Sequence, residues 1–177
     1  MKSNIIQIDN QGNGFEDAQN ETKRVAVYEE LDSRQATRLM LITEEMLSLA
    51  RSITGEMEAT FWIEGKDKAF QLHLGTSTVM DTEKRTLLLS TASSRKNEAS
   101  KTFLGYIRDA FERAMLPDVD HSKDELPYEV LIDLPNHVVE DQEWDGYEKS
   151  VLRRLADNVK ISIRGNNVDM TVSKKFE

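Results

Sequence analysis

Two adjacent carboxylates, Glu44 and Glu45, are the residues of this sequence whose type and position first suggest chemistry. They lie in TEEMLSLARSITGE, from Thr43 to Glu56, which has the pattern of a helix stopped by Gly55. A glutamate on the first long helix of an α/β domain can serve as a catalytic base. It can equally be a solvated side chain, so its place on the helix decides between the two.

The two glutamates take different places on that helix when successive residues are stepped by about 100°. Glu44 falls on a polar face, whereas Glu45 lies at the edge of an apolar stripe, about 40° from Leu49. Two interpretations of Glu45 remain open: a useful carboxylate where the helix meets a sheet, or a boundary residue whose stem packs while its head reaches water. The apolar stripe consists of Leu39, Ile42, Met46, Leu49 and Ile53.

A helix and then a hairpin are predicted around these glutamates. The helix should begin at a capping box, in which Asp32 and Gln35 satisfy each other's backbone N–H groups. Apolar and polar residues then alternate over Glu56–Glu64 and again over Ala69–Leu74, which predicts two half-buried strands. The turn between them is predicted at Gly65–Lys68.

Three further helices are predicted after the hairpin. Asp81 should cap a short helix over Thr82–Ser90, and Asn97 or a neighbour should cap a longer one over Glu98–Met115. EKSVLRRLAD, from Glu148 to Asp157, predicts the last helix. The apolar residues of the longer helix fall at steps of four: Phe103, Ile107, Phe111 and Met115.

Short alternating segments at both ends of the chain predict more strands. Ile5–Ile8 predicts one strand, and Arg24–Tyr28 predicts another, with a helix as the open alternative. Residues 158–176 predict a second hairpin with its turn at Gly165–Asn167. Helices separated from antiparallel strands predict an α+β fold: a two-layer α/β sandwich with one mostly antiparallel sheet and helices on one face.

Composition limits the classes of protein to which the chain can belong. A net charge of −9 over 177 residues disfavours nucleic-acid binding, which needs clustered Lys and Arg. The absence of cysteine excludes disulfides, thiol catalysis and thiolate metal sites. The three histidines lack metal-ligand spacing, so no metal site is predicted. No apolar run suits a signal peptide or a membrane span, so we expect a cytoplasmic protein without a membrane partner.

The negative charge is concentrated in one segment. Residues 117–148 contain eleven acidic residues, one lysine and all three prolines of the chain. Loops of this length are uncommon and often form lids or flexible segments. We therefore expect a single domain over residues 1–177 that carries an acidic, proline-containing insertion or lid-like loop at residues 117–143.

The order of elements and the glutamate helix together resemble the Bergerat ATP-binding fold of the GHKL group, which includes histidine kinases, gyrase and anti-sigma-factor serine kinases. Ala36–Glu56 is similar to the glutamate helix of the anti-sigma kinases, and Leu152–Phe176 is similar to their terminal helix and hairpin. The resemblance implies a Bergerat-like sandwich in which Glu45 is the catalytic glutamate. ATP and magnesium would be the cofactors of an active member.

The magnesium and adenine motifs of that group are degenerate here. The group's magnesium-binding asparagine, four residues after the glutamate, corresponds to Leu49, or to Ser48 if Glu44 is aligned instead. The D-x-G-x-G loop that recognises adenine is reduced to a lone Gly75, with Asp81 as an acidic residue at the wrong spacing.

The phosphate-binding motif is degenerate as well. Its second glycine-rich stretch is represented only by Gly105 or Gly146, and one glycine cannot form a nest of N–H groups around phosphates. Lys101, with Arg95 and Lys96, surrounds a predicted helix start and is the remaining candidate for contact with an anion.

Three hypotheses about function follow. The favoured one is a cytoplasmic regulatory module with a degenerate ATPase fold, which needs no cofactor and binds a protein such as a STAS-type antagonist or a sigma factor. The alternative is an ATP-binding protein-serine kinase with variant motifs, in which Glu45 is the general base. The third is a scaffold domain whose sheet face pairs with a second copy in a homodimer.

Overall fold

The computed structural model describes residues 1–9, 11–53, 58–116 and 151–177. The predicted stop at Gly55 and the acidic insertion at residues 117–143 lie outside these residues, as do Gly146 and two of the three histidines. The elements, in chain order, are β1 (Ile6–Asp9), α1 (Phe15–Tyr28), α2 (Ser33–Ile53), β2 (Glu58–Lys66), β3 (Ala69–Ser77), α3 (Thr82–Thr91), η1 (Glu98–Ser100), α4 (Phe103–Ala114), α5 (Val151–Leu155), β4 (Asn158–Arg164) and β5 (Asn167–Lys175).

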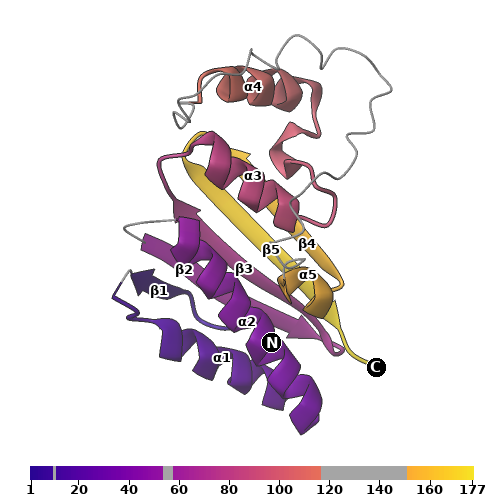
Figure 1. The fold of residues 1–177 in the computed structure, drawn as a ribbon. Helices are drawn as coiled ribbons and strands as arrows, with labels where there is room; N and C mark the ends of the chain where they lie inside the picture. Colours follow the sequence, from indigo (N-terminus) through magenta and orange to yellow (C-terminus); the bar gives the residue numbers. More distant parts are fainter. Residues whose placement is uncertain (10, 54–57, 117–150) are drawn as a thin grey trace.

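The strands form one open, five-stranded sheet in the order β1-β2-β3-β5-β4, and every neighbouring pair is antiparallel. Helices α1, α2, α3 and α5 lie over one face of this sheet, whereas α4 lies beyond the end at which β4 turns into β5 (Figure 1). The predicted α+β class with an antiparallel sheet is confirmed.

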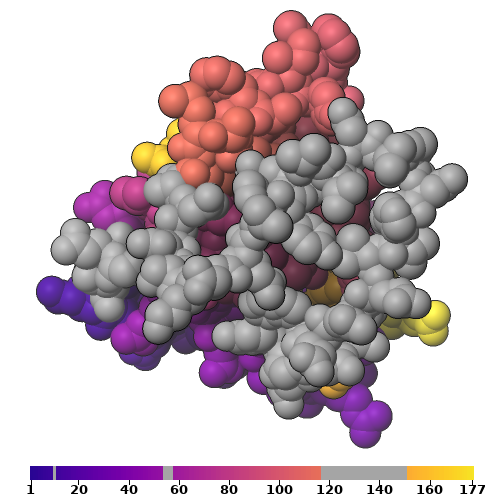
Figure 2. Space-filling model, turned by 45° about the horizontal axis from the view of Figure 1, so that its top comes forward, coloured from indigo at the N-terminus to yellow at the C-terminus, as the bar shows by residue number. Residues whose placement is uncertain are grey.

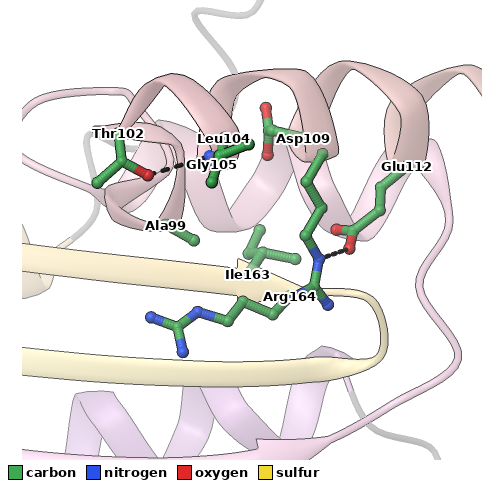
Figure 3. Close-up of a pocket in the computed structure, with 9 residues that line it drawn as sticks. Ala99, Thr102, Leu104, Gly105, Asp109, Glu112, Ile163 and Arg164 are labelled. Carbon is green, nitrogen blue, oxygen red and sulfur yellow. Dashed lines mark hydrogen bonds and ion pairs between the residues drawn. The ribbon is translucent and has the colours of Figure 1, made fainter.

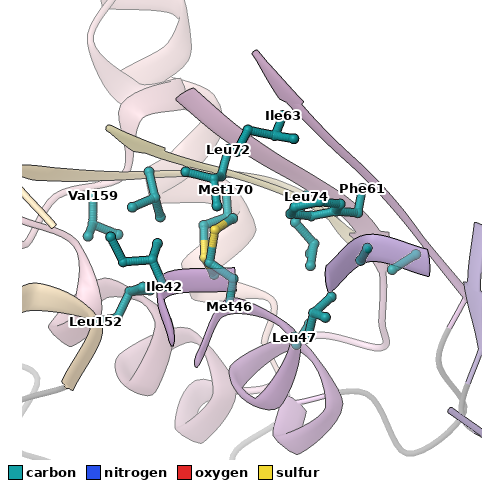
Figure 4. Close-up of a cluster of buried hydrophobic side chains, with 14 of the residues drawn as sticks. Ile42, Met46, Leu47, Phe61, Ile63, Leu72, Leu74, Leu152, Val159 and Met170 are labelled. Atoms are coloured by element: carbon teal, nitrogen blue, oxygen red, sulfur yellow. The ribbon is translucent and has the colours of Figure 1, made fainter. Parts of the chain in front are cut away.

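Alternation along each strand builds the core on the helical side. In β2 the residues Ala59, Phe61 and Ile63 are buried, and in β3 the residues Phe70 and Leu72 meet the same layer. Met46 and its neighbours on α2 pack against these side chains from the helical side of the sheet (Figure 4). One-sided burial of this kind leaves the alternate residues of each strand on the other face. There the Trp62 and His73 rings stack with centroids 4.7 Å apart.

Several local predictions are confirmed by hydrogen bonds. The backbone N–H of Gln35 donates to Asp32 Oδ1 (2.8 Å), and the Asp32 N–H donates to Gln35 Oε1 (3.2 Å), which completes the capping box. Asp81 accepts from the N–H of Lys84 and caps α3. The second predicted hairpin also forms, and alternate side chains on its two strands are buried: Val159, Ile161, Ile163, Val168, Met170 and Val172.

Other predictions need correction. Arg24–Tyr28 is the end of α1 and not a strand; its buried residues, Val25 and Ala26, are adjacent, as on a helix face. Strand β2 continues through Gly65 to Lys66, and the turn is only Asp67-Lys68, both at positive φ. Gly65 pairs with Phe70 within the hairpin, and glycine is needed there because an added Cβ would lie 2.8 Å from the Phe70 ring.

The predicted helix over Glu98–Met115 is two elements. Asn97 caps only the short η1, because its Oδ1 accepts from the N–H of Ala99. Thr102 then caps α4 by accepting from the N–H of Gly105 (3.0 Å). Because of this break, α4 does not continue the direction of η1, and the candidate site is formed by α4.

Candidate functional site

The structure places Glu45 half-buried on α2 and Glu44 in solvent, as their angular positions predicted. Within the described part of the chain, no hydrogen bond or ion pair joins the side chain of Glu45 to another residue. Ser48 is exposed on the polar face of α2, and Leu49, which is half-buried, offers no oxygen to a metal. Among the described residues, no three His, Asp or Glu side chains gather into a metal-binding group.

The other predicted nucleotide-binding residues are distributed over separate parts of the fold. Gly75 lies on the open face of the sheet, next to Thr60 Oγ1, and therefore on the opposite side from Glu45. Asp81 is engaged as the cap of α3. Lys101 is exposed and pairs with Glu98 beside η1. Of these candidates, the structure brings together only Lys101 and Gly105, which lie at the start of α4.

The structure instead draws attention to α4, which is attached to the body through its polar side. The Asp109 carboxylate points inward, where Oδ1 accepts from Arg85 Nη2 and from Asn97 Nδ2, both at 2.5 Å. The Arg85 side chain on α3 is only 7% exposed, so its charge requires such a partner. Asp109 therefore fastens α4 to α3.

Asn97 connects this ion pair to the edge of the sheet. Its Nδ2 also donates to the carbonyl of Ile163 (2.9 Å), and its Oδ1 accepts from the Ile163 N–H (2.8 Å). Ser93 makes the equivalent pair of contacts with Val159. The outer edge of β4 is therefore occupied at two positions, which blocks strand addition along that edge by a second chain.

Glu112 provides a second attachment, at the turn between β4 and β5 (Figure 3). Its Oε2 accepts from the Gly165 N–H (2.9 Å), and its Oε1 accepts from Arg108 Nε (2.6 Å). Burial acts to raise the pKa of the Glu112 carboxyl, but the hydrogen bonds from Gly165 and Arg108 outweigh it and hold the pKa below its ordinary value. The ionised Glu112 carboxylate thus remains a hydrogen-bond acceptor for the Gly165 N–H in the turn.

Gly105 belongs to the same inward side of α4. A Cβ at this position would lie 2.2 Å from the Ala99 carbonyl oxygen, so only glycine permits this approach of α4 to η1. A hollow of about 260 Å³ remains under the helix, and Leu104 and Arg164 are among its lining residues. Gly105 therefore has a packing role in this structure.

The apolar side of α4 consequently faces outward. No residue of α4 is buried, although its side chains include two phenylalanines. Of the twelve large apolar residues exposed in the described ranges, six lie between residues 103 and 115. They are Phe103 (77%), Leu104 (77%), Tyr106 (64%), Ile107 (50%), Phe111 (66%) and Met115 (68%). We call this set the α4 apolar face.

The sequence analysis identified the four-residue spacing of apolar side chains on α4, but it did not predict that these side chains face solvent while the polar side of the helix faces the body. The available signal was Gly105, Asp109 and Glu112, which recur every three or four residues and so share one face. The inward direction of this face depends on the contacts of Asp109 with Arg85, which lies twenty-four positions before it in the chain, and with Asn97. No pattern within the helix itself identifies those partners.

Comparison with known proteins adds no family to this description. No protein-family model matches the chain, and no curated protein matches it. In the residues that the structure describes, no helix is long and apolar enough to cross a membrane.

Proposed function

We propose that this protein is a cytoplasmic regulatory module that acts by binding another protein, and that α4 is its docking element. The observation that carries the proposal is the inverted attachment of α4, with ion pairs inward and apolar side chains outward. An amphipathic helix on a globular domain normally buries its apolar stripe. The reverse arrangement leaves that surface available to a partner.

The size of the α4 apolar face suits this role. Phe103, Tyr106 and Phe111 are each about two-thirds exposed or more, so at roughly 200 Å² per aromatic side chain they leave about 400 Å² of aromatic surface in water. Patches of that size on monomers are often functional. Burying it is worth about 10 kcal/mol at ~25 cal/mol per Å², which is comparable with the cost of association, about 4–15 kcal/mol.

The ancestry of the module is proposed to be that of a Bergerat-type ATPase domain with degenerate nucleotide motifs, nearest to the anti-sigma-factor kinases. The element order, with a glutamate helix before a hairpin and a terminal helix followed by a hairpin, supports this ancestry. A STAS-type antagonist or a sigma factor is then the proposed class of partner. Glu45 remains the proposed base of the alternative, a protein-serine kinase that uses ATP and magnesium.

The test is photo-cross-linking in the source cells with a photoreactive phenylalanine analogue at position 111. Tyr28, which is 66% exposed, is the matched control position, because it ends α1, which lies at the opposite end of the molecule from α4 (Figure 1). The proposal predicts one reproducible protein adduct from position 111 that the control does not give, and the purified adduct partner should bind the full chain. Equal adducts from both positions would overturn the proposal.

A further inference from the structure

Around the α4 apolar face, acidic and basic side chains differ in their exposure to solvent. On η1 and α4 the acidic side chains Glu98, Asp109 and Glu112 are only 17%, 14% and 19% exposed, and each is engaged in an ion pair. The basic side chains of the same region are exposed, although Lys101 also pairs with Glu98 and Arg108 with Glu112. They are Arg95, Lys96, Lys101, Arg108 and Arg113.

Two of these bases border the α4 apolar face on opposite sides. Stepping by about 100° per residue from Phe103 places Ile107 and Phe111 within about 80° of it on the same side. Arg108 then falls at about 140° and Arg113 at about 80° in the other direction. The outward surface of α4 is therefore an apolar strip between two arginines, on a chain whose net charge is −9.

This surface projects from one end of the molecule, where residues near 103–116 stand out from the body (Figure 2). We infer that the α4 apolar face binds an acidic amphipathic helix of a partner protein, one whose apolar stripe is flanked by Asp or Glu. The inference rests on the proposed function and names the chemistry of its partner. Apolar contact supplies the affinity, and the flanking carboxylates meet Arg108 and Arg113.

A second copy of this chain is a poorer occupant of the same surface. In a symmetric antiparallel pair of α4 helices, each flank meets its own equivalent, so Arg108 faces Arg108 and Arg113 faces Arg113. The acids on α4 are already engaged within their own copy, Asp109 with Arg85 and Glu112 with Arg108 and Gly165, so they do not offer carboxylates to a second copy. Juxtaposition of like charges disfavours that pair.

The probes for the test are two fluorescein-labelled helical peptides that share a leucine stripe and differ only in having Glu or Lys at every flanking position. Anisotropy of each peptide is followed against the full-length protein at low salt and again at high salt. We expect the Glu peptide to bind at least tenfold more tightly than the Lys peptide, and to lose that advantage at high salt because flanking charges are screened.

Charge and apolar variants then assign the binding to α4. Arg108→Glu/Arg113→Glu should reverse the preference between the peptides, whereas Lys23→Glu/Arg34→Glu, with the same change in net charge on exposed positions, should not. Phe111→Ser should weaken binding of the Glu peptide at least tenfold, and Tyr28→Ser, at an exposed aromatic residue of α1, should leave it unchanged. These sites are exposed, so an unchanged melting temperature verifies that each variant is folded.

Three results would overturn the inference: equal affinity for the two peptides, indifference to the Arg108→Glu/Arg113→Glu change, or light scattering that shows a dimer dissociated by Phe111→Ser. The last result would assign the surface to a second copy. If the peptides fail but position 111 still cross-links to a protein, the inference fails while the proposed function stands. If the cross-link is also absent, both fail.

Discussion

The attachment of α4 through Asp109 makes a quantitative prediction. In Asp109→Ala the guanidinium of Arg85 loses its carboxylate while remaining largely buried, since its side chain is only 7% exposed. Removing one member of a buried ion pair costs about 3–5 kcal/mol, because the other charge is left unpaired. The hydrogen bond from Asn97 Nδ2 is lost as well.

The destabilisation caused by Asp109→Ala should not exceed the free energy that holds α4 against the body of the protein. Helix α4 has no buried residue and contacts chiefly η1, so it can detach and return Arg85 to water. We therefore expect about 3 kcal/mol of local destabilisation, which corresponds to about a hundredfold increase in the exchange rate of α4 amide hydrogens at 1.4 kcal/mol per tenfold. The amides of β3 should keep their protection.

Hydrogen exchange on the folded protein, resolved by peptide, measures both quantities. The control is Lys84→Ala, which removes a partly exposed i,i+3 ion pair with Asp81 and should cost under about 0.5 kcal/mol. In Arg85→Met/Asp109→Leu no unpaired charge is left, so protection of α4 should recover. Unchanged exchange in Asp109→Ala would refute the reasoning, because α4 would then be held by something other than its ion pair.

Four further outcomes are expected. Asn97→Ala should lower the free energy of unfolding by about 2–3 kcal/mol in a urea titration, since the peptide groups of Ile163 lose their partners. Gly105→Ala should accelerate exchange in α4 although alanine favours helices by about 1 kcal/mol, because the added Cβ meets the Ala99 carbonyl; faster exchange confined to another helix would contradict this. The pKa of Glu112 is lower in the folded protein than its ordinary value of 4.5, so the ionised carboxylate adds stability above pH 4.5 that is lost as the pH falls through the folded pKa. Protection of the α4 amides from exchange should therefore decline below pH 4.5, and it should decline less in Glu112→Gln. Millimolar ATP or ADP with magnesium should leave the melting temperature unchanged, and a shift that disappears in Glu45→Gln would restore the kinase hypothesis.

The sequence by itself determined the parts of this protein that depend on neighbours in the chain. The capping box of Asp32 and Gln35, the cap at Asp81 and the two hairpins follow from short patterns, because the groups that satisfy each other lie a few residues apart. The half-buried place of Glu45 was predicted from helix geometry alone. Errors occurred where a short pattern fits two structures, as at Arg24–Tyr28.

Only the tertiary structure decided which way α4 faces. The apolar spacing of Phe103, Ile107 and Phe111 predicts burial, yet the charges of Arg85 and Asp109 and the amide of Asn97 decide the orientation. These groups come from three separate elements, and a buried charge left without its partner costs more than an apolar face left in water. The candidate site is therefore a product of contacts between distant residues, which no local pattern records.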